Sequence, residues 1–285
     1  MLDEKGANSH LLVMTATPIP RTLAMTVYAD LDISLIREYP EGRQPVLTYL
    51  MDENRKRDVY NALINRLSEG QQGVVVCPVI EGSEEADMKN ALEMRVRLDK
   101  ILSPRFSVEL IHGRLPADEK DRIMDQFRKG NIDLLVGTTV IEVGVHAPGA
   151  TVIVIEHPER FGLAQLHQLR GRIGRGTERG LCFLMTGKGV SPDALSRLKI
   201  LVETHDGFEI AQKDLEMRGQ GELMGIRQAG VGELDFREMI REPELLMSAR
   251  KEAEQILDSD PGLSRPENRL LKEMARSMSG RPLEI

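Results

Sequence analysis

The chain has 285 residues, of which 41% are hydrophobic and 29% charged, with a formal net charge of −7 and a pI near 5.5. No apolar run approaches the ~18 residues that a membrane span needs, so we expect no membrane association. The acidic balance argues against a protein that coats nucleic acid through bulk positive charge, but it is compatible with a narrow basic strip.

The first predicted element is a buried strand in a leader that comprises residues 1–45. The run Leu-Leu-Val-Met-Thr-Ala-Thr occupies residues 11–17 and is followed by Pro-Ile-Pro-Arg. A Thr-x-Thr-Pro pattern at a strand end suits hydrogen bonding of Thr15 and Thr17 to a neighbouring loop, and Pro20 suits the first turn of a helix. An ordinary turn is the alternative at this point.

Residues 46–188 alternate between short β-rich runs and amphipathic helical patterns. This alternation predicts an α/β domain with a parallel sheet covered by helices on both faces. Pro116, Asp118 and Glu119 mark a helix start, and Lys129-Gly130 marks its end. The predicted strands are 46–50, 73–79, 107–112, 132–137, 151–156 and 181–185, and the predicted helices are 54–69, 84–102, 116–129 and 163–173.

Cys77 and Cys182 are the two cysteines of the chain, and both lie inside apolar runs. They show no Cys-x-x-Cys spacing, so we expect buried free thiols in a reducing compartment and no metal site. A cytoplasmic location follows as an expectation.

Two predicted strands end in residues suited to a phosphate backbone. His112, Gly113 and Arg114 follow one strand, and Thr138 and Thr139 follow another. Threonine hydroxyls and backbone N–H groups at a strand end can bind phosphate oxygens. Further along this second segment, Gly144 permits close approach of the backbone to a ligand. The alternative is a capped helix start followed by a turn.

The segment Gln165-Leu-His-Gln-Leu-Arg-Gly-Arg-Ile-Gly-Arg-Gly176 carries the strongest local signal. On a helix, Gln168, Arg172 and Arg175 fall within about 60° of one another, because successive residues are 100° apart. Leucines and Ile173 cluster on the opposite side. Arginine is suited to a transferring phosphoryl group because it stays charged and donates two parallel hydrogen bonds. We therefore predict that these side chains share an open surface at the carboxyl edge of the sheet.

Residues 189–285 show helical patterns and no strand signal. The patterns lie near 192–204, 207–217, 243–258 and 264–277, with a Gly-rich stretch at 219–232. We expect residues 192–228 to form two packed helices and a loop. The first helix would bury Leu195, Leu198, Leu201 and Val202 against an apolar face that contains Phe208 and Ile210.

Taken together and in this order, these segments resemble superfamily 2 helicases. Residues 15–17 resemble motif III, 74–80 motif IV, 112–114 the motif between IV and V, 138–148 motif V, and 165–175 motif VI. The stretches TATPIPRTLAMTVYADLD, TTVIEVGV and GLAQLHQLRGRIGRG narrow the resemblance to the RecG family of translocases that remodel branched DNA. Residues 206–228 are similar to the translocation motif of that family, a helical hairpin and loop.

The resemblance implies a RecA-like sheet flanked by helices and ATP with Mg²⁺ as the nucleotide. It implies catalytic roles for Gln168, Arg172 and Arg175, with Gly144 and His146 also lining the nucleotide site. It further implies branched or duplex DNA as a partner, no oligomer, and two groups of residues that handle that DNA. The backbone contacts are His112, Gly113, Arg114, Thr138 and Thr139, and the coupling residues are Thr15, Thr17, Arg197, Arg218 and Gln228.

Two departures from the family pattern bear on these expectations. His146 stands where the family has Asp, which puts nucleotide affinity or coupling in doubt. No Gly-x₄-Gly-Lys-Ser/Thr and no strand-borne Asp-Glu-x-His occurs in the sequence. The family places both motifs in a first RecA-like domain that, with a wedge domain, precedes Thr15. We therefore expect the chain to be a C-terminal motor half that is inactive alone.

Two alternative readings remain open from the sequence. A fragment of the transcription–repair coupling translocase shares motif VI and the hairpin, although residues 28–32 and 76–80 favour the RecG family. A module that binds DNA or a partner without hydrolysing ATP is the alternative from another class, because an arginine finger needs a phosphate-binding loop to act on.

Overall fold

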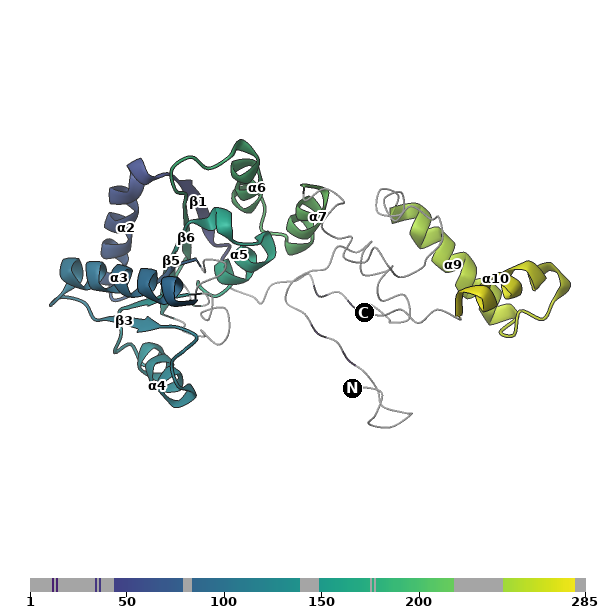
Figure 1. Cartoon of the computed structure of the whole chain (residues 1–285), viewed down its shortest axis with the longest axis horizontal. Helices are drawn as coiled ribbons and strands as arrows, with labels where there is room; N and C mark the ends of the chain where they lie inside the picture. Colours follow the sequence, from purple (N-terminus) through teal and green to yellow (C-terminus); the bar gives the residue numbers. More distant parts are fainter. Residues whose placement is uncertain are drawn as a thin grey trace. The chain divides into compact units, whose positions relative to one another are not determined.

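The computed structural model describes residues 44–78, 84–138, 149–174, 176, 178–217 and 243–279, together with 12, 14, 34 and 36 (Figure 1). Two compact units divide the chain within its helix α7 (Gly207–Met217), so that Ile36–Ala211 belongs to the first unit and Gln212–Ile285 to the second. The domain boundary at 188/189 that the sequence suggests stays a prediction. The helix that follows this boundary, Pro192–Glu203, packs with the sheet in the first unit.

The first unit is built on a parallel sheet of six strands. Each of the six predicted strands is confirmed, with ends that move by at most three residues. The spatial order β1-β6-β5-β2-β4-β3 places β5 and β2 in the centre, and their residues are buried throughout. The bounds are β1 Leu47–Met51, β2 Gln72–Val76, β3 Val108–Ile111, β4 Leu134–Gly137, β5 Ala150–Glu156 and β6 Leu181–Met185.

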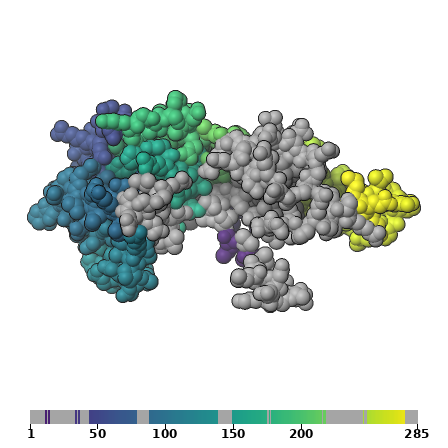
Figure 2. Space-filling view, viewed as in Figure 1, coloured from purple at the N-terminus to yellow at the C-terminus, as the bar shows by residue number. Residues whose placement is uncertain are grey.

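Helices cover both faces of this sheet, as the sequence predicts. On one face, α2 (Lys56–Ser68) and α3 (Glu84–Leu102) pack through residues such as Leu63 and Leu98. On the other, α4 (Ala117–Arg128), α5 (Leu163–Arg170) and α6 (Pro192–Glu203) pack through residues such as Phe127. The space-filling view shows α2, α3, α4 and α6 as parts of one packed body, coloured from blue to green (Figure 2). The result is a three-layer α/β domain.

Local sequence signals explain where the covering helices begin. Pro116 directly precedes α4, whose first turn carries Asp118 and Glu119 near the positive end of the helix dipole. Ser191 caps α6, because its hydroxyl accepts a hydrogen bond from the backbone N–H of Ala194 at 3.2 Å. After α4 the chain turns at Gly130, where φ is +79°.

Helix α6 buries a slightly different stripe from the one expected. Leu198 and Leu201 are buried as predicted, but Val202 is 39% exposed and Ile200 is buried in its place. The reason is that α6 packs on β1 and on α5, so that Ile200 and not Val202 faces the domain. Helix α7 (Gly207–Met217) begins four residues later and buries Ile210.

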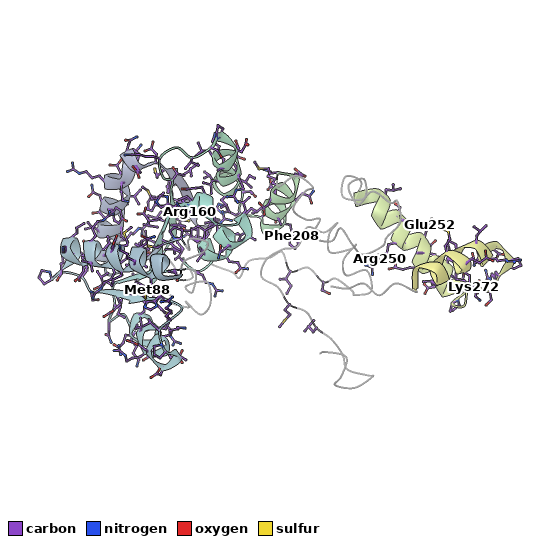
Figure 3. All side chains as sticks on the ribbon, viewed as in Figure 1. Met88, Arg160, Phe208, Arg250, Glu252 and Lys272 are labelled. Atoms are coloured by element: carbon purple, nitrogen blue, oxygen red, sulfur yellow. The ribbon has the colours of Figure 1, made fainter. Side chains whose placement is uncertain are left out.

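The described part of the second unit contains α9 (Pro243–Ser259), a short 3-10 helix η6 (Pro266–Asn268) and α10 (Arg269–Ser279). Asp260 holds the connection between them, because its carboxylate accepts from the backbone N–H groups of Ser264 and Arg265 and from the Asn268 amide at 2.8–2.9 Å. These bonds lower the pKa of Asp260 to about 2. Figure 3 labels Arg250 and Glu252 on α9 and Lys272 on α10. No helix in the described part of the chain is long and apolar enough to cross a membrane.

Candidate functional site

The carboxyl ends of β3 and β4 bring two of the predicted DNA-contacting segments together. Ile111 pairs with Gly137 in the parallel register, so His112 and Thr138 leave neighbouring strands at the same level. Thr138 is buried and His112 is half-buried, whereas Gly113 and Arg114 are exposed. The backbone N–H of Cys77, after β2, donates to the carbonyl of Gly137 at 2.8 Å and fixes the third strand end beside them.

Positive charge gathers around His112 at this edge. The Lys120 ammonium donates to the carbonyl of Gly113 at 2.7 Å. Burial, and then the charges of Lys120 and Arg114, lower the pKa of His112. Its buried Nδ1 has no hydrogen-bond partner in the described part of the chain. The edge therefore presents an imidazole near two cations and one carboxylate, that of Glu119, and this excess of positive charge suits a phosphate group.

A buried charge network, which the sequence reasoning missed, lies at the same carboxyl edge. Glu156, the last residue of β5, is 5% exposed. The Tyr60 hydroxyl donates to its carboxylate at 2.8 Å, and the Lys56 ammonium lies 3.3 Å from it. Burial and the negative charge of Glu156 raise the pKa of Tyr60 well above its usual range and that of Cys77 to about 12. The network ties α2 to the end of β5. The sequence feature that could have predicted it is the carboxylate at the end of the apolar run TVIVIE.

The end of motif VI, from Arg172 to Gly174, lies at the opposite, amino edge of the sheet, which corrects the prediction that Arg172 shares the carboxyl edge. Helix α5 begins after the end of β5 and runs back along the sheet. The backbone N–H of Gly174 donates to the carbonyl of Ala150, the first residue of β5, at 2.9 Å. Gly174, with φ of +62°, also approaches the backbone of Gly180, just before β6. The eight residues of α5 rise about 12 Å along the sheet, and the turn from Gly171 to Gly174 completes the return to the amino edge.

The helix is also shorter than predicted, because α5 ends at Arg170 and not at residue 173. Gln168 and Arg172 therefore do not lie on one continuous helical face, although one further turn links them through the bond from the Arg172 N–H to the Leu169 carbonyl at 3.1 Å. The predicted burial of Leu166, Leu169 and Ile173 is confirmed. These apolar residues anchor the segment on the sheet.

Arg172 is half-buried, and within the described residues its guanidinium forms neither a hydrogen bond nor an ion pair. Gln168 is half-buried one turn earlier. Among the described residues, no carboxylate therefore neutralises Arg172. The other predicted site residues lie outside the described part of the chain, namely Thr15, Thr17, Thr139, Gly144, His146, Arg175, Arg218 and Gln228.

Arg197, predicted as a coupling residue, ties α6 to the carboxyl edge. Its Nη2 donates to the backbone carbonyl of Glu159 at 2.8 Å. Glu159 lies in the 3-10 helix η4 (Pro158–Arg160) that follows β5, beside Arg160, which Figure 3 labels. Arg197 thus fixes α6 to the turn that leads into α5.

Comparison with known proteins agrees with this geometry. Residues 55–177 match the family model of the helicase conserved C-terminal domain, and residues 204–284 match the model described as ATP-dependent DNA helicase RecG, domain 3, C-terminal. The fold and the motif order define the class, which is the second RecA-like domain of a superfamily 2 helicase. Within this class the chain belongs, over the part it spans, to the RecG family.

Individual relatives lead to the same family. An ATP-dependent DNA helicase RecG from Acidithiobacillus ferridurans is 49% identical over 90% of this chain, and one from Thermotoga maritima is 46% identical over 90%. A structure of RecG bound to a three-way DNA junction superposes with a TM-score of 0.64 at 44% identity over 81% of the chain. The chain spans 38% and 33% of the lengths of the two relatives and 30% of the chain in that structure.

Proposed function

We propose that the chain forms the second motor half of an ATP-dependent DNA helicase that remodels branched DNA in recombination and repair. In the whole enzyme, ATP binds between this domain and a preceding first RecA-like domain, to which a wedge domain is joined. The relatives are named ATP-dependent DNA helicases, and the related solved structure holds a three-way junction. A cytoplasmic location is part of the proposal.

The observation that carries this proposal is the position of Arg172. It stands on a rigid anchor of buried leucines at the amino edge, and within the described residues it has no partner that neutralises it. A guanidinium held in this way retains its hydrogen-bonding capacity for a ligand from outside the domain. An arginine finger contributes roughly 10³–10⁵ to rate in other NTPases, by stabilising charge on the transferring phosphoryl group.

Bound ATP would meet Arg172 and Arg175 at oxygens of its γ-phosphate, with Gln168 beside them, and Gly144 and His146 would line the nucleotide. ATP would supply the phosphoryl group whose transfer to water drives movement along DNA. Mg²⁺ would be held mainly by the preceding domain, with the phosphates.

The carboxyl edge is proposed as the DNA-binding edge. Thr138, Thr139 and the segment His112–Arg114 contact the phosphate backbone, where the cations around His112 favour a negative charge. Thr15, Thr17, Arg197, Arg218 and Gln228 relay closure of the two motor domains to the duplex. Of these, Arg197 already joins α6 to the turn after β5 in the described structure.

The test is a full-length enzyme, made by joining this chain to the N-terminal part of the A. ferridurans relative. This enzyme should hydrolyse ATP in response to forked DNA, and Arg172→Lys should lower kcat by about 10³-fold while leaving fork affinity unchanged. Arg179→Lys is the matched control, since Arg179 is an exposed arginine whose guanidinium donates to the Pro45 carbonyl at 3.3 Å. Turnover within a few-fold of the parent in Arg172→Lys would contradict the proposal.

A further inference from the structure

The guanidinium of Arg170 is buried in the domain, whereas the side chain of Arg172 is half-buried. Arg170 is 4% exposed, and its Nη1 donates to the backbone carbonyls of Leu201 at 2.7 Å and Thr204 at 3.0 Å. Both carbonyls lie at the carboxyl-terminal end of α6, where unpaired carbonyl groups carry partial negative charge. A buried charge needs such compensation, so the interaction fixes the end of α5 on the end of α6.

Thr204 connects this contact to the start of α7. Its hydroxyl donates to the Glu209 carboxylate at 2.6 Å and accepts from the backbone N–H of Asp206 at 3.1 Å. The Asp206 carboxylate in turn accepts from the N–H of Phe208 at 2.8 Å. Figure 3 labels Phe208 at the beginning of α7. The joint between α6 and α7 is thus a hydrogen-bonded turn whose backbone carbonyl is held by Arg170.

Arg170 is also joined rigidly to Arg172. The Gly171 N–H donates to the His167 carbonyl at 3.0 Å, and the Arg172 N–H donates to the Leu169 carbonyl at 3.1 Å. After α5 ends at Arg170, one hydrogen-bonded turn therefore extends to Arg172. A displacement of the Arg172 backbone must either move Arg170 with it or break these two bonds.

His167, which lies near Arg170, adds no second positive charge there. Burial first, and the nearby Arg170 second, lower the pKa of His167 to about 4. The imidazole is consequently neutral near pH 7, and Arg170 remains the cation that faces the α6 carbonyls from this turn of α5.

We propose that Arg170 is a positioning residue that transmits the engagement of Arg172 to the joint between α6 and α7. The inference rests on the proposed function, in which Arg172 meets the γ-phosphate. Arg172 touches the nucleotide, whereas Arg170 touches only protein and acts through the helix ends. Its loss should separate ATP turnover from strand unwinding, and should not abolish turnover.

The experiment measures both activities in the same full-length enzyme. Arg170→Lys keeps the charge and removes the guanidinium geometry. We expect unwinding of a fork to fall about 10-fold while ATP turnover stays within about 3-fold and the KM for ATP within about 2-fold. Arg128→Lys is the matched control, because Arg128 at the end of α4 donates to the Met124 carbonyl at 3.2 Å, far along the sheet order from α6.

The outcomes separate this inference from the proposed function. If the parent enzyme does not unwind forks, or if Arg172→Lys keeps full turnover, the proposed function fails. If Arg170→Lys loses turnover and unwinding in parallel, or loses neither, the positioning role fails. If the Tm of Arg170→Lys lies more than about 10 °C below that of the parent, unwinding and ATP turnover are measured in Thr204→Val instead. That variant keeps the carbonyl but removes the hydroxyl bonds to α7, and it should show the same loss of unwinding with turnover retained.

Discussion

The two edges of the sheet hold their predicted site residues in different ways. At the carboxyl edge, His112 and Thr138 directly follow strands, and neighbouring backbone and lysine groups fix their positions. At the amino edge, Arg172 follows not a strand but a helix that crosses the sheet. The carboxyl edge thus resembles a preformed surface, whereas the amino edge presents a side chain that has no partner among the described residues.

Under the proposed function, this difference would allow one small domain to bind DNA at one edge and the nucleotide at the other. Ligands at opposite ends of the strands do not compete for the same residues, and the helices that connect the edges can pass a movement between them. Helices α5 and α6 both run from the carboxyl edge toward the amino edge, and Arg197 and Arg170 tie α6 down near its middle and at its end. The predictions below test whether the edges are independent in stability and in binding.

The largest effect is expected from the buried face of α5, because it carries motif VI across the sheet. Leu166 is 1% exposed, so Leu166→Ala should lower the free energy of unfolding by about 3 kcal/mol through the lost burial and the resulting cavity. Leu92→Ala on α3, where the leucine is 46% exposed, should cost less than about 1 kcal/mol. The chain has no tryptophan, so urea unfolding is followed by far-UV circular dichroism. Equal losses in the two variants would contradict the anchoring role of α5.

His167 on α5 predicts a pH dependence of stability. Its pKa is lowered to about 4 in the folded chain, so between pH 6.5 and 4 the unfolded chain binds more protons and stability falls as the pH falls. The shift corresponds to about 3 kcal/mol, and we expect about 2 kcal/mol once partial solvent access is considered. His167→Gln should remove this part of the pH dependence. An unchanged slope in that variant would show that His167 is not its source.

The close approach of Gly174 to Gly180 should be sensitive to one added carbon. A Cβ at Gly174 would lie 3.0 Å from the Gly180 nitrogen, in addition to the strain of φ +62°. Gly189, with φ of +72°, has open space around the same position. Gly174→Ala should therefore destabilise the chain by about 1–2 kcal/mol more than Gly189→Ala. Equal destabilisation, measured by thermal unfolding, would mean that the amino-edge loop tolerates the added carbon.

The smallest effect compares two arginines at the two ends of β3. Arg114 follows the strand, whereas Arg105 precedes it and stacks on Phe106 at 5.0 Å. In the full-length enzyme, Arg114→Ala should raise the Kd for a fork about 5-fold and reduce the salt slope by about one, without changing the KM for ATP. Arg105→Ala should leave fork affinity within about 2-fold. A similar loss in both would remove the distinction between the edges.

The sequence predicts the sheet well because buried strands appear as short, continuous apolar runs. Runs such as GVVV and TVIVIE have no amphipathic alternative of helical length, and Pro116 and Ser191 mark helix starts by local chemistry. The edge at which Arg172 lies follows from the parallel topology and not from the motif alone, because a helix between two parallel strands returns the chain to their amino edge. The early end of α5 changes the direction of the Arg172 side chain but not the edge that the segment reaches.

Arg170 was missed for a different reason. A charged residue in a surface helix is expected to face solvent, and its interaction partners are backbone carbonyls some thirty residues away. Its position four residues after Leu166 and next to Leu169 placed it near the buried stripe, which was the available signal. Long-range contacts to backbone groups leave no trace in residue patterns, so only the fold shows them.

Hydrogen–deuterium exchange of the full-length enzyme tests the separation of the two edges most directly. Fork DNA alone should protect peptides that contain His112–Arg114 and Thr138, and a non-hydrolysable ATP analogue alone should protect the peptide that contains residues 168–174. With both ligands present, the joint between α6 and α7 should gain protection beyond the sum of the two single effects. Protection of residues 168–174 by fork DNA alone, with no response to the ATP analogue, would contradict the assignment of the amino edge to the nucleotide.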